Sequence, residues 1–429
     1  MDIKVNQTGE LTLGGISALK LADQYQTPLY VMEEDKILSA IRAYKDNFSK
    51  YYRGKAVVCY ASKAFCCKEM YRICKREDIC ADVVSGGELA TALSVGFPAE
   101  RAFFHGNNKT EDELVLAVKS GVGIIIVDNL TELERVDKIS ASLGKITRVS
   151  FRIKPGIEAH THDYMKTGQI DSKFGLALEN GEALEAIRHV CSNYAHLELI
   201  GLHSHIGSQI FDAEPFMDSA RVMLTFMKTV KETTGKTIRH LSLGGGLGVK
   251  YTDSDTPMPL SETIKMVSEA VMDECGKLGL ELPEIAVEPG RSIVGEAGTT
   301  LYTVGSVKEI ADIRNYIAVD GGMTDNPRYA LYGSIYTVLI ANRANEKKNY
   351  IAAVAGRCCE SGDLIGKDME IQKPVPGDIL AVLTTGAYNY TMASNYNRVP
   401  RPAVVFVKDG ESHIVVKRET YEDLYHLDV

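Results

Sequence analysis

The sequence predicts an α/β fold joined to an all-β fold: a TIM-like (β/α)8 barrel followed by a β-sandwich or barrel-like domain. Two patterns carry this prediction. Between Ala56 and Arg291, short apolar runs alternate with amphipathic stretches of helical period, which is typical of parallel β-α units. After Arg291 the apolar runs are β-rich and show little helical periodicity. We therefore expect a barrel domain over residues 34–296 and a β domain built from residues 1–33 and 297–429.

The barrel prediction rests on eight apolar runs, and a closed (β/α)8 barrel of about 250 residues needs that many strands. Helical stretches such as Thr110–Ser120 and Pro215–Thr234 separate the runs. Gly121 and Gly235 follow these stretches, where the helices should end. The strands are expected at Ala56–Tyr60, Ala81–Val84, Ala102–His105, Ile124–Asp128, Arg148–Ile153, Leu199–His205, His240–Leu243 and Glu284–Glu288.

The β domain is predicted from later runs that are separated by turns such as Lys408-Asp409-Gly410. The segment before Ala40 contains Thr27-Pro28-Leu29-Tyr30-Val31, and we expect it to pair with the sheet of this domain. The predicted strands are Thr300–Val304, Tyr316–Val319, Tyr350–Val354, Ile379–Leu383, Ala403–Val407 and His413–Val416.

Composition favours a soluble globular protein that acts on small molecules. Of the 429 residues, 45% are hydrophobic and 24% are charged, and the net charge of -9 offers no basic surface for nucleic acid. The chain begins Met1-Asp2-Ile3-Lys4-Val5 without a signal pattern, and no apolar run approaches the roughly 20 residues that span a bilayer. We expect a cytoplasmic protein that binds neither nucleic acid nor membranes.

The nine cysteines predict free thiols in a reducing compartment. None forms a Cys-x-x-Cys motif, and the adjacent pairs Cys66-Cys67 and Cys358-Cys359 are poorly placed to hold one ion. We therefore expect no bound metal.

Polar or glycine-rich clusters follow four of the predicted barrel strands. Tyr60-Ala61-Ser62-Lys63-Ala64 follows the first strand, His203–Ser208 the sixth, Gly244–Gly246 the seventh and Glu288–Arg291 the eighth. Because the strand ends of a closed parallel barrel share one rim, these clusters should meet in space. An amine, an imidazole, a glycine loop suited to a phosphate and a carboxylate together indicate pyridoxal phosphate.

Lys63 is the best candidate for a reactive amine. A lysine that ends an apolar strand points to the barrel mouth, which favours a Schiff-base role over a solvated surface charge. Its carbonyl partner is then either a substrate, as in an aldolase, or pyridoxal phosphate. Glu288 favours pyridoxal phosphate, because a carboxylate that keeps the pyridine nitrogen protonated makes the cofactor an electron sink. The alternative role of Glu288 is an ion pair with Arg291.

The other rim residues each have a structural alternative. Gly244–Gly246 can direct successive N–H groups at a phosphate, with Ser208 adding a hydroxyl, but a tight turn explains the glycines equally well. His205 is either a ring that lies against a flat cofactor or a hydrogen-bonded core histidine. His203 is interpreted as a core histidine.

One loop of the β domain is a candidate site. Ala355–Asp363 places two thiols beside two carboxylates, and such crowding is more typical of a site than of the alternative, a structural turn. Gly386-Ala387-Tyr388 and Asn326–Tyr332 are weaker signals, which loop chemistry alone can explain.

These motifs, in this order, resemble those of the diaminopimelate decarboxylases, a family in the alanine-racemase-like, fold-type III class of pyridoxal phosphate enzymes. The resemblance covers nearly the whole chain. It implies decarboxylation of meso-2,6-diaminopimelate to L-lysine and CO2, the last step of lysine biosynthesis, with pyridoxal 5'-phosphate as cofactor. Further motifs that carry the resemblance are Asp82–Leu89, His105–Lys109, Asp171–Gly175, Asn395–Arg398 and Pro400–Pro402.

The resemblance also implies roles for individual residues. Lys63 would carry the cofactor, His205 would stack on its ring, and either Cys359 or Lys63 would reprotonate the product. The active sites would form between the two subunits of a homodimer, with Cys359 and Glu360 reaching the partner's barrel. The cofactor would contact Ser208, Gly245, Gly246, Glu288, Pro289, Gly290, Arg291 and Tyr388, and the substrate Arg291, Arg328, Tyr332, Glu360 and Tyr388.

The expected substrate follows from these charges. Arg291 and Arg328 suit a distal carboxylate and Glu360 a distal ammonium, whereas ornithine or lysine would leave the arginines unpaired. Tyr329 departs from the family pattern, which usually has proline there, and this leaves the conformation of the Arg328 loop open. Two alternatives are a related decarboxylase of ornithine, arginine or carboxynorspermidine and, from another class, a non-catalytic pyridoxal phosphate carrier. A racemase is a further option, which would release no CO2.

Overall fold

The computed structural model describes residues 3–157 and 172–429. The predicted loop from Ile157 to Gln169 lies, from residue 158 onward, outside the described residues. The chain forms two compact units. The barrel unit comprises Ala40–Gly248 and Pro257–Gly290, and the β unit comprises Met1–Ser39, Val249–Thr256 and Arg291–Val429.

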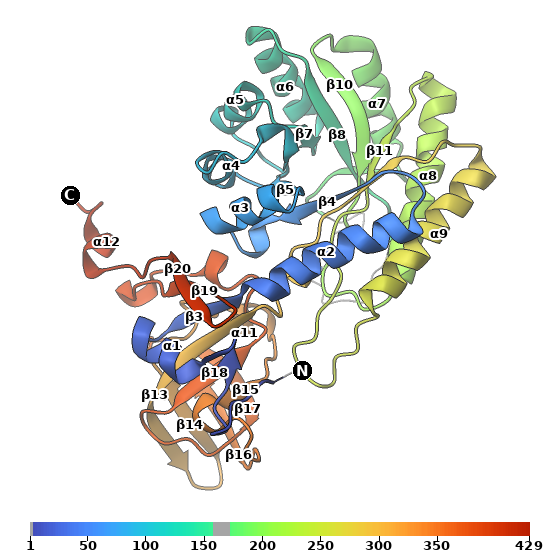
Figure 1. Ribbon diagram of the computed structural model, residues 1–429. Coiled ribbons are helices and arrows are strands. Elements are labelled where there is room, and N and C mark those ends of the chain that lie inside the picture. Colours follow the sequence, from blue (N-terminus) through green and yellow to red (C-terminus); the bar gives the residue numbers. More distant parts are fainter. Residues whose placement is uncertain (1–2, 158–171) are drawn as a thin grey trace. The chain divides into compact units, whose positions relative to one another are not determined.

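The barrel unit closes eight parallel strands into a ring, which confirms the predicted fold class (Figure 1). In chain order the strands are β4 (Ala56–Ala61), β5 (Cys80–Val83), β6 (Ala102–Phe104), β7 (Ile124–Val127), β8 (Thr147–Lys154), β10 (Leu197–His203), β11 (His240–Ser242) and β12 (Glu284–Val287). Each strand pairs with the next, β12 pairs with β4, and β8 pairs directly with β10. The short β9 (Leu176–Ala177) pairs with the end of β8.

Helices alternate with these strands and surround them (Figure 1). Their ends follow from local sequence. Thr110 and Glu113 form a capping box at the start of α5, and Gly121 ends this helix in a left-handed conformation with φ of 77°. The helices are α2 (Glu34–Tyr51), α3 (Lys68–Arg76), α4 (Gly86–Leu93), α5 (Glu111–Ser120), α6 (Leu130–Ser142), α7 (Glu182–Asn193), α8 (Glu214–Thr234) and α9 (Leu260–Leu278).

A buried apolar cluster joins four barrel strands. It contains Cys59 of β4, Phe103 of β6, Ile124 and Ile126 of β7, and Ala286 of β12. All four residues of β7 are buried, as expected for a parallel strand that is covered on both faces.

The β unit is built on a mixed sheet with the order β17-β16-β14-β13-β3-β19-β20. Its strands are β3 (Leu29–Glu33), β13 (Gly298–Ile310), β14 (Arg314–Val319), β15 (Val338–Ile340), β16 (Tyr350–Ala355), β17 (Leu364–Ile371), β18 (Ile379–Leu383), β19 (Ala403–Lys408) and β20 (Glu411–Val416). The N-terminal strand β3 pairs antiparallel with β13 and parallel with β19, as the sequence predicts. The β unit also contains the paired strands β1 (Thr12–Leu13) and β2 (Ile16–Ser17) and the helices α1 (Ala18–Tyr25), α10 (Arg291–Val294), α11 (Arg328–Tyr332) and α12 (Tyr421–Tyr425).

Strand β18 contributes to two separate hydrophobic clusters. Leu380 and Val382 belong to one, and Ala381 and Leu383 belong to the other. The division follows from the strand geometry, because successive side chains point to opposite faces. Both edges of β18 are paired, one with β13 and the other with β15.

Among residues 3–157 and 172–429, no helix combines the length and the apolar character that crossing a bilayer requires.

Candidate active site

The rim clusters of the barrel unit lie directly after the carboxyl ends of their strands, as predicted. Lys63 stands in a 3-10 turn, Ser62–Ala64, that follows β4, and it is exposed between two buried neighbours. The loop of Glu288 packs against this segment, because the Ala61 N–H donates to the Pro289 carbonyl at 3.1 Å. A Cβ at Gly290 would lie 2.9 Å from the Cβ of Ala64. The Lys63 and Glu288 segments are therefore in contact.

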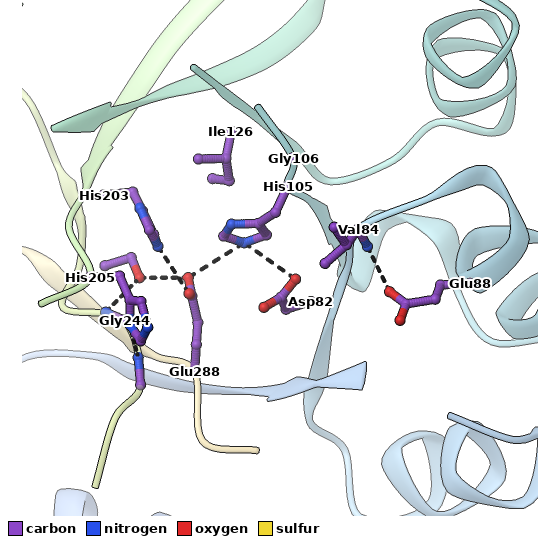
Figure 2. Close-up of polar contacts among 12 residues, drawn as sticks. Asp82, Val84, Glu88, His105, Gly106, Ile126, His203, His205, Gly244 and Glu288 are labelled. Carbon is purple, nitrogen blue, oxygen red and sulfur yellow. Dashed lines mark hydrogen bonds and ion pairs between the residues drawn. The ribbon is translucent and has the colours of Figure 1, made fainter. Parts of the chain in front are cut away.

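Glu288 is the centre of a buried polar cluster (Figure 2). His203 Nε2 lies 2.9 Å from Glu288 Oε2, and the Ser242 hydroxyl donates to Oε1 at 2.7 Å. Burial by itself raises the pKa of this carboxyl, but His203, His105 and the two hydrogen bonds outweigh it and hold that pKa well below its usual value. Glu288 is therefore an ionised carboxylate at neutral pH.

A second carboxylate, Asp82 at the end of β5, lies on the other side of His105 (Figure 2). His105 Nε2 is 3.8 Å from Asp82 Oδ1 and 3.6 Å from Glu288 Oε1, which is too long for a hydrogen bond to either. Burial raises the pKa of Asp82 well above its usual value, and Lys63 opposes this shift. Burial also raises the pKa of Glu88, which Lys63 again opposes. Lys63 thus lies within electrostatic reach of both carboxylates.

His205 and the glycine loop form one structure. The Gly245 N–H points to His205 Nδ1 at 3.3 Å, and the Gly244 N–H donates to Ser242 Oγ at 3.2 Å. Burial and the nearby charge of Lys63 lower the pKa of His205, so its ring is neutral. A parallel bridge between Ile210 and Leu247 ties the two loops together beyond these contacts.

The glycine loop leaves no room for side chains. A Cβ at Gly245 would lie 2.1 Å from the carbonyl oxygen of Glu288, and one at Gly246 would lie 2.4 Å from that of Gly207. Gly244 and Gly246 also have φ of +69° and +123°, which glycine adopts readily. Ser208 directly follows Gly207 in the sequence, and it therefore belongs to the loop that packs against Gly246. Packing against neighbouring backbone therefore requires these glycines, and a loop of this kind is also compatible with a bound phosphate.

The β unit brings together the predicted substrate residues Arg291, Arg328, Tyr332 and Tyr388. Arg291 Cζ lies 4.8 Å from the centre of the Tyr388 ring, and Arg328 Cζ lies 5.5 Å from it. Arg328 also contacts the Tyr332 ring, at 5.1 Å. Tyr388 has φ of 60°, an uncommon conformation for a tyrosine. Both guanidinium groups are buried, and one tyrosine ring contacts the two of them.

Cys359 and Glu360 lie on an exposed loop of the β unit. The Cys359 N–H donates to Asn397 Oδ1 at 2.9 Å, and Glu360 Oε1 accepts from the Gly362 N–H at 3.2 Å. Asp363 fixes the turn, because it accepts from Met323 N–H at 2.6 Å and Cys358 N–H at 2.7 Å. The backbone of this loop is therefore well held, while the thiol and carboxylate of the predicted pair remain exposed.

Sequence reasoning did not assign roles to Asp82, Glu88, His105, Ser242 or Tyr251. Tyr251 accepts a hydrogen bond from Arg291 Nη1 at 2.5 Å. The interpretation of His203 as a hydrogen-bonded core histidine agrees with its burial, but its partner is Glu288. A usable signal existed for His105, which ends the predicted strand Ala102–His105 and therefore lies at the rim, whereas Asp82 lies inside the predicted strand Ala81–Val84.

The residues of the barrel rim fit pyridoxal phosphate. An exposed lysine amine suits its aldehyde, the glycine loop suits its phosphate, and a buried carboxylate suits its basic ring nitrogen. The fold and this rim place the chain among the barrel-type pyridoxal phosphate enzymes.

Comparisons with known proteins narrow this class. The model of the family described as "Pyridoxal-dependent decarboxylase, pyridoxal binding domain" matches residues 34–295. The diaminopimelate decarboxylase of Bacillus subtilis is 48% identical over 99% of this chain and 96% of its own. The crystal structure of the M. jannaschii diaminopimelate decarboxylase with L-lysine has a TM-score of 0.91 and 33% identity, covering 100% of this chain and 97% of the other. The chain belongs to the diaminopimelate decarboxylase family.

A second solved structure supports the same assignment. The diaminopimelate decarboxylase of Helicobacter pylori, in complex with L-lysine, has a TM-score of 0.86 and 32% identity, covering 96% of this chain and 98% of the other. The resemblance stated from the sequence motifs is confirmed.

Proposed function

We propose that the protein decarboxylates meso-2,6-diaminopimelate to L-lysine and CO2 with pyridoxal 5'-phosphate, as the last step of lysine biosynthesis. The observation that carries the proposal is the buried, ionised Glu288 beside the segment of Lys63. Residues 34–296 would form the cofactor-binding domain. Residues 1–33 and 297–429 would supply substrate and dimer contacts. We also propose that the protein acts in the cytoplasm.

Pyridoxal phosphate, when bound, supplies the sink for the electrons that the departing CO2 leaves behind. Lys63 would supply the amine that anchors the cofactor, and His205 would lie against its ring. Glu288 would hold a proton on the ring nitrogen. The phosphate would be bound by Gly245, Gly246 and Ser208, with Pro289, Gly290, Arg291 and Tyr388 completing the cofactor contacts.

The β unit would determine which substrate is accepted. Arg291 and Arg328 would hold the distal carboxylate of the substrate, Glu360 would accept its distal ammonium, and Tyr332 and Tyr388 would contact its chain. A substrate that lacks the second carboxylate, such as ornithine, offers no counter-charge at its distal end to these two buried guanidinium groups. A site built to bind such a group can reject an analogue that lacks it by about 10⁴-fold.

Turnover measurements test this function directly. Purified protein with pyridoxal phosphate should release CO2 from the meso isomer, with L-lysine as product, and not from the LL isomer, ornithine, arginine or lysine. CO2 from another diamino acid would refute the substrate assignment while keeping the cofactor site. No CO2 from any of them, with pyridoxal phosphate bound, would favour a carrier.

The reprotonating group is proposed to be Cys359, with Lys63 as the second candidate. Cys359 offers an exposed thiol on a loop whose backbone is fixed by Asn397 and Asp363. A Cys359→Ala variant should lose turnover but bind pyridoxal phosphate normally. Intact turnover in this variant would assign the proton to Lys63.

We propose a homodimer in which Cys359 and Glu360 act in the partner's active site. Inactive Lys63→Ala and Cys359→Ala protomers, mixed and reassociated, should then recover about a quarter of wild-type activity, because half of the dimers hold one intact site of two. Lys63→Ala mixed with Glu288→Ala is the matched control and should recover none, since both lesions lie in the barrel unit. No recovery in the first mixture would contradict the shared site.

A further inference from the structure

The two oxygens of Glu288 are each fixed by a separate donor (Figure 2). His203 Nε2 lies 2.9 Å from Oε2, and the Ser242 hydroxyl lies 2.7 Å from Oε1. Ser242 is fully buried, and His203 is 1% exposed. A carboxylate offers about four lone-pair positions. These two contacts leave acceptor capacity on both oxygens for one further donor.

The surroundings of His203 determine its protonation. Its Nδ1 is buried and has no hydrogen-bond partner among the described residues, so the ring proton belongs on Nε2, which faces Glu288. An imidazolium would bury an additional N–H without an acceptor, which is costly. Burial lowers the pKa of His203 in agreement with this geometry. His203 is therefore a neutral donor.

Neutral donors and a cation have different consequences for Glu288. A lysine or arginine bound to the carboxylate would form a pair with no net charge. An imidazole N–H and a hydroxyl stabilise the ionised carboxylate without adding a positive charge, so the net negative charge remains. The other groups that act on this cluster are Lys63, Arg152 and Asp82, together with the rings of His105 and His205, whose pKa values burial lowers. His105 is too distant to donate, at 3.6 Å.

We propose that His203 and Ser242 are positioning residues, whose neutral N–H and O–H fix both oxygens of Glu288 and keep it ionised toward the ring nitrogen of pyridoxal phosphate. The inference rests on the proposed function, since it requires the cofactor ring to lie at Glu288. It goes further than that function, because it makes the protonation of the cofactor's pyridine nitrogen depend on His203 and Ser242, which act through Glu288.

The test is the ¹⁵N chemical shift of the ring nitrogen in enzyme loaded with ring-¹⁵N pyridoxal phosphate, measured with the dissociation constant of the cofactor. His203→Leu removes the donor, and His203→Gln retains a neutral N–H near the Nε2 position. The leucine variant should lower the ratio of protonated to deprotonated nitrogen about ten-fold or more, the effect of losing one hydrogen bond to a charged group. The glutamine variant should stay within about three-fold of wild type.

Ser242→Ala and His105→Gln complete the design. Ser242→Ala removes the smaller donor and should shift the ratio in the same direction as His203→Leu, which keeps the proposal testable if the leucine variant does not fold. His105→Gln should change the ratio less than either. An unchanged ratio in Ser242→Ala and His203→Leu, or an equal change in His105→Gln, overturns the proposal. A wild-type enzyme whose ring nitrogen is already deprotonated would refute the role of Glu288 in the proposed function instead.

Discussion

Replacing Gly245 by alanine tests whether the glycine loop is a cofactor cradle or an ordinary turn. The added Cβ would lie 2.1 Å from the carbonyl oxygen of Glu288, which is backbone and cannot rotate away. Carbon and oxygen atoms approach to about 3.3 Å at closest, so one backbone segment must move by about 1.2 Å. That segment carries the Glu288 carboxylate, and the displaced loop would carry the phosphate contacts.

The expected result has two parts. Overpacking of this size destabilises the fold by about 1–3 kcal/mol, which calorimetry of the protein without cofactor should detect. A displacement of about 1 Å at reacting groups lowers turnover about 100-fold, and we expect cofactor affinity to fall as well. Steady-state kinetics and a pyridoxal phosphate titration measure these two effects.

Gly276→Ala is the matched control, because the same methyl group meets nothing within 4 Å. Gly276 lies in α9, where alanine should stabilise the helix by about 0.5–1 kcal/mol. The two variants should therefore change stability in opposite directions, and only Gly245→Ala should affect the cofactor. A Gly245→Ala enzyme with wild-type affinity and turnover would refute the reasoning.

Three further outcomes follow from buried charges. Lys109→Met leaves Glu132 buried without its ion-pair partner and should cost about 3–5 kcal/mol in denaturant unfolding, whereas a loss below 1 kcal/mol would contradict it. Burial raises the pKa of Asp325 to about 7, so wild-type stability should fall by up to about 4 kcal/mol between pH 4 and 7 as the folded state loses its bound proton. In the Asp325→Asn variant, the free energy of unfolding, measured from denaturant curves at a series of pH values, should change less between pH 4 and 7. Arg328→Ala should lower kcat/KM for meso-diaminopimelate by about 10²-fold or more, and unchanged kinetics would exclude its assigned contact.

Periodicity predicted the barrel well because most of its strands are centred on short apolar runs, such as Ile124–Val127 of β7. The predicted Ala56–Tyr60 and Glu284–Glu288 differ from β4 and β12 by one residue at most at each end. The β unit was harder. Strand β17 was missed because Lys367, Asp368 and Glu370 line its exposed positions and break the apolar pattern. The length of β13 was also missed, because its second half, which pairs with β14, contains the exposed polar residues Ser306, Lys308 and Glu309.

The positions of candidate site residues were predictable where they directly follow a strand end, as for Lys63 and Glu288. Ser242 could have been found, since β11 and β12 are neighbours in the barrel and Ser242 pairs with Ala286. His105 could not be assigned to Glu288 in this way, because β6 and β12 are not adjacent and their contact crosses the ring interior. Tyr251 lies in Val249–Thr256, a short segment between two barrel elements that joins the β unit without any sequence pattern to signal it.

The alternation of β18 between two hydrophobic clusters has a consequence for folding. A slip of its pairing by one residue would place Leu380 and Val382 where Ala381 and Leu383 belong, so both clusters select the same register. Neither cluster can then lose its packing without disturbing the other through this strand. The β unit should open as a single cooperative block, with the amide protons of β18 among the last to exchange with solvent.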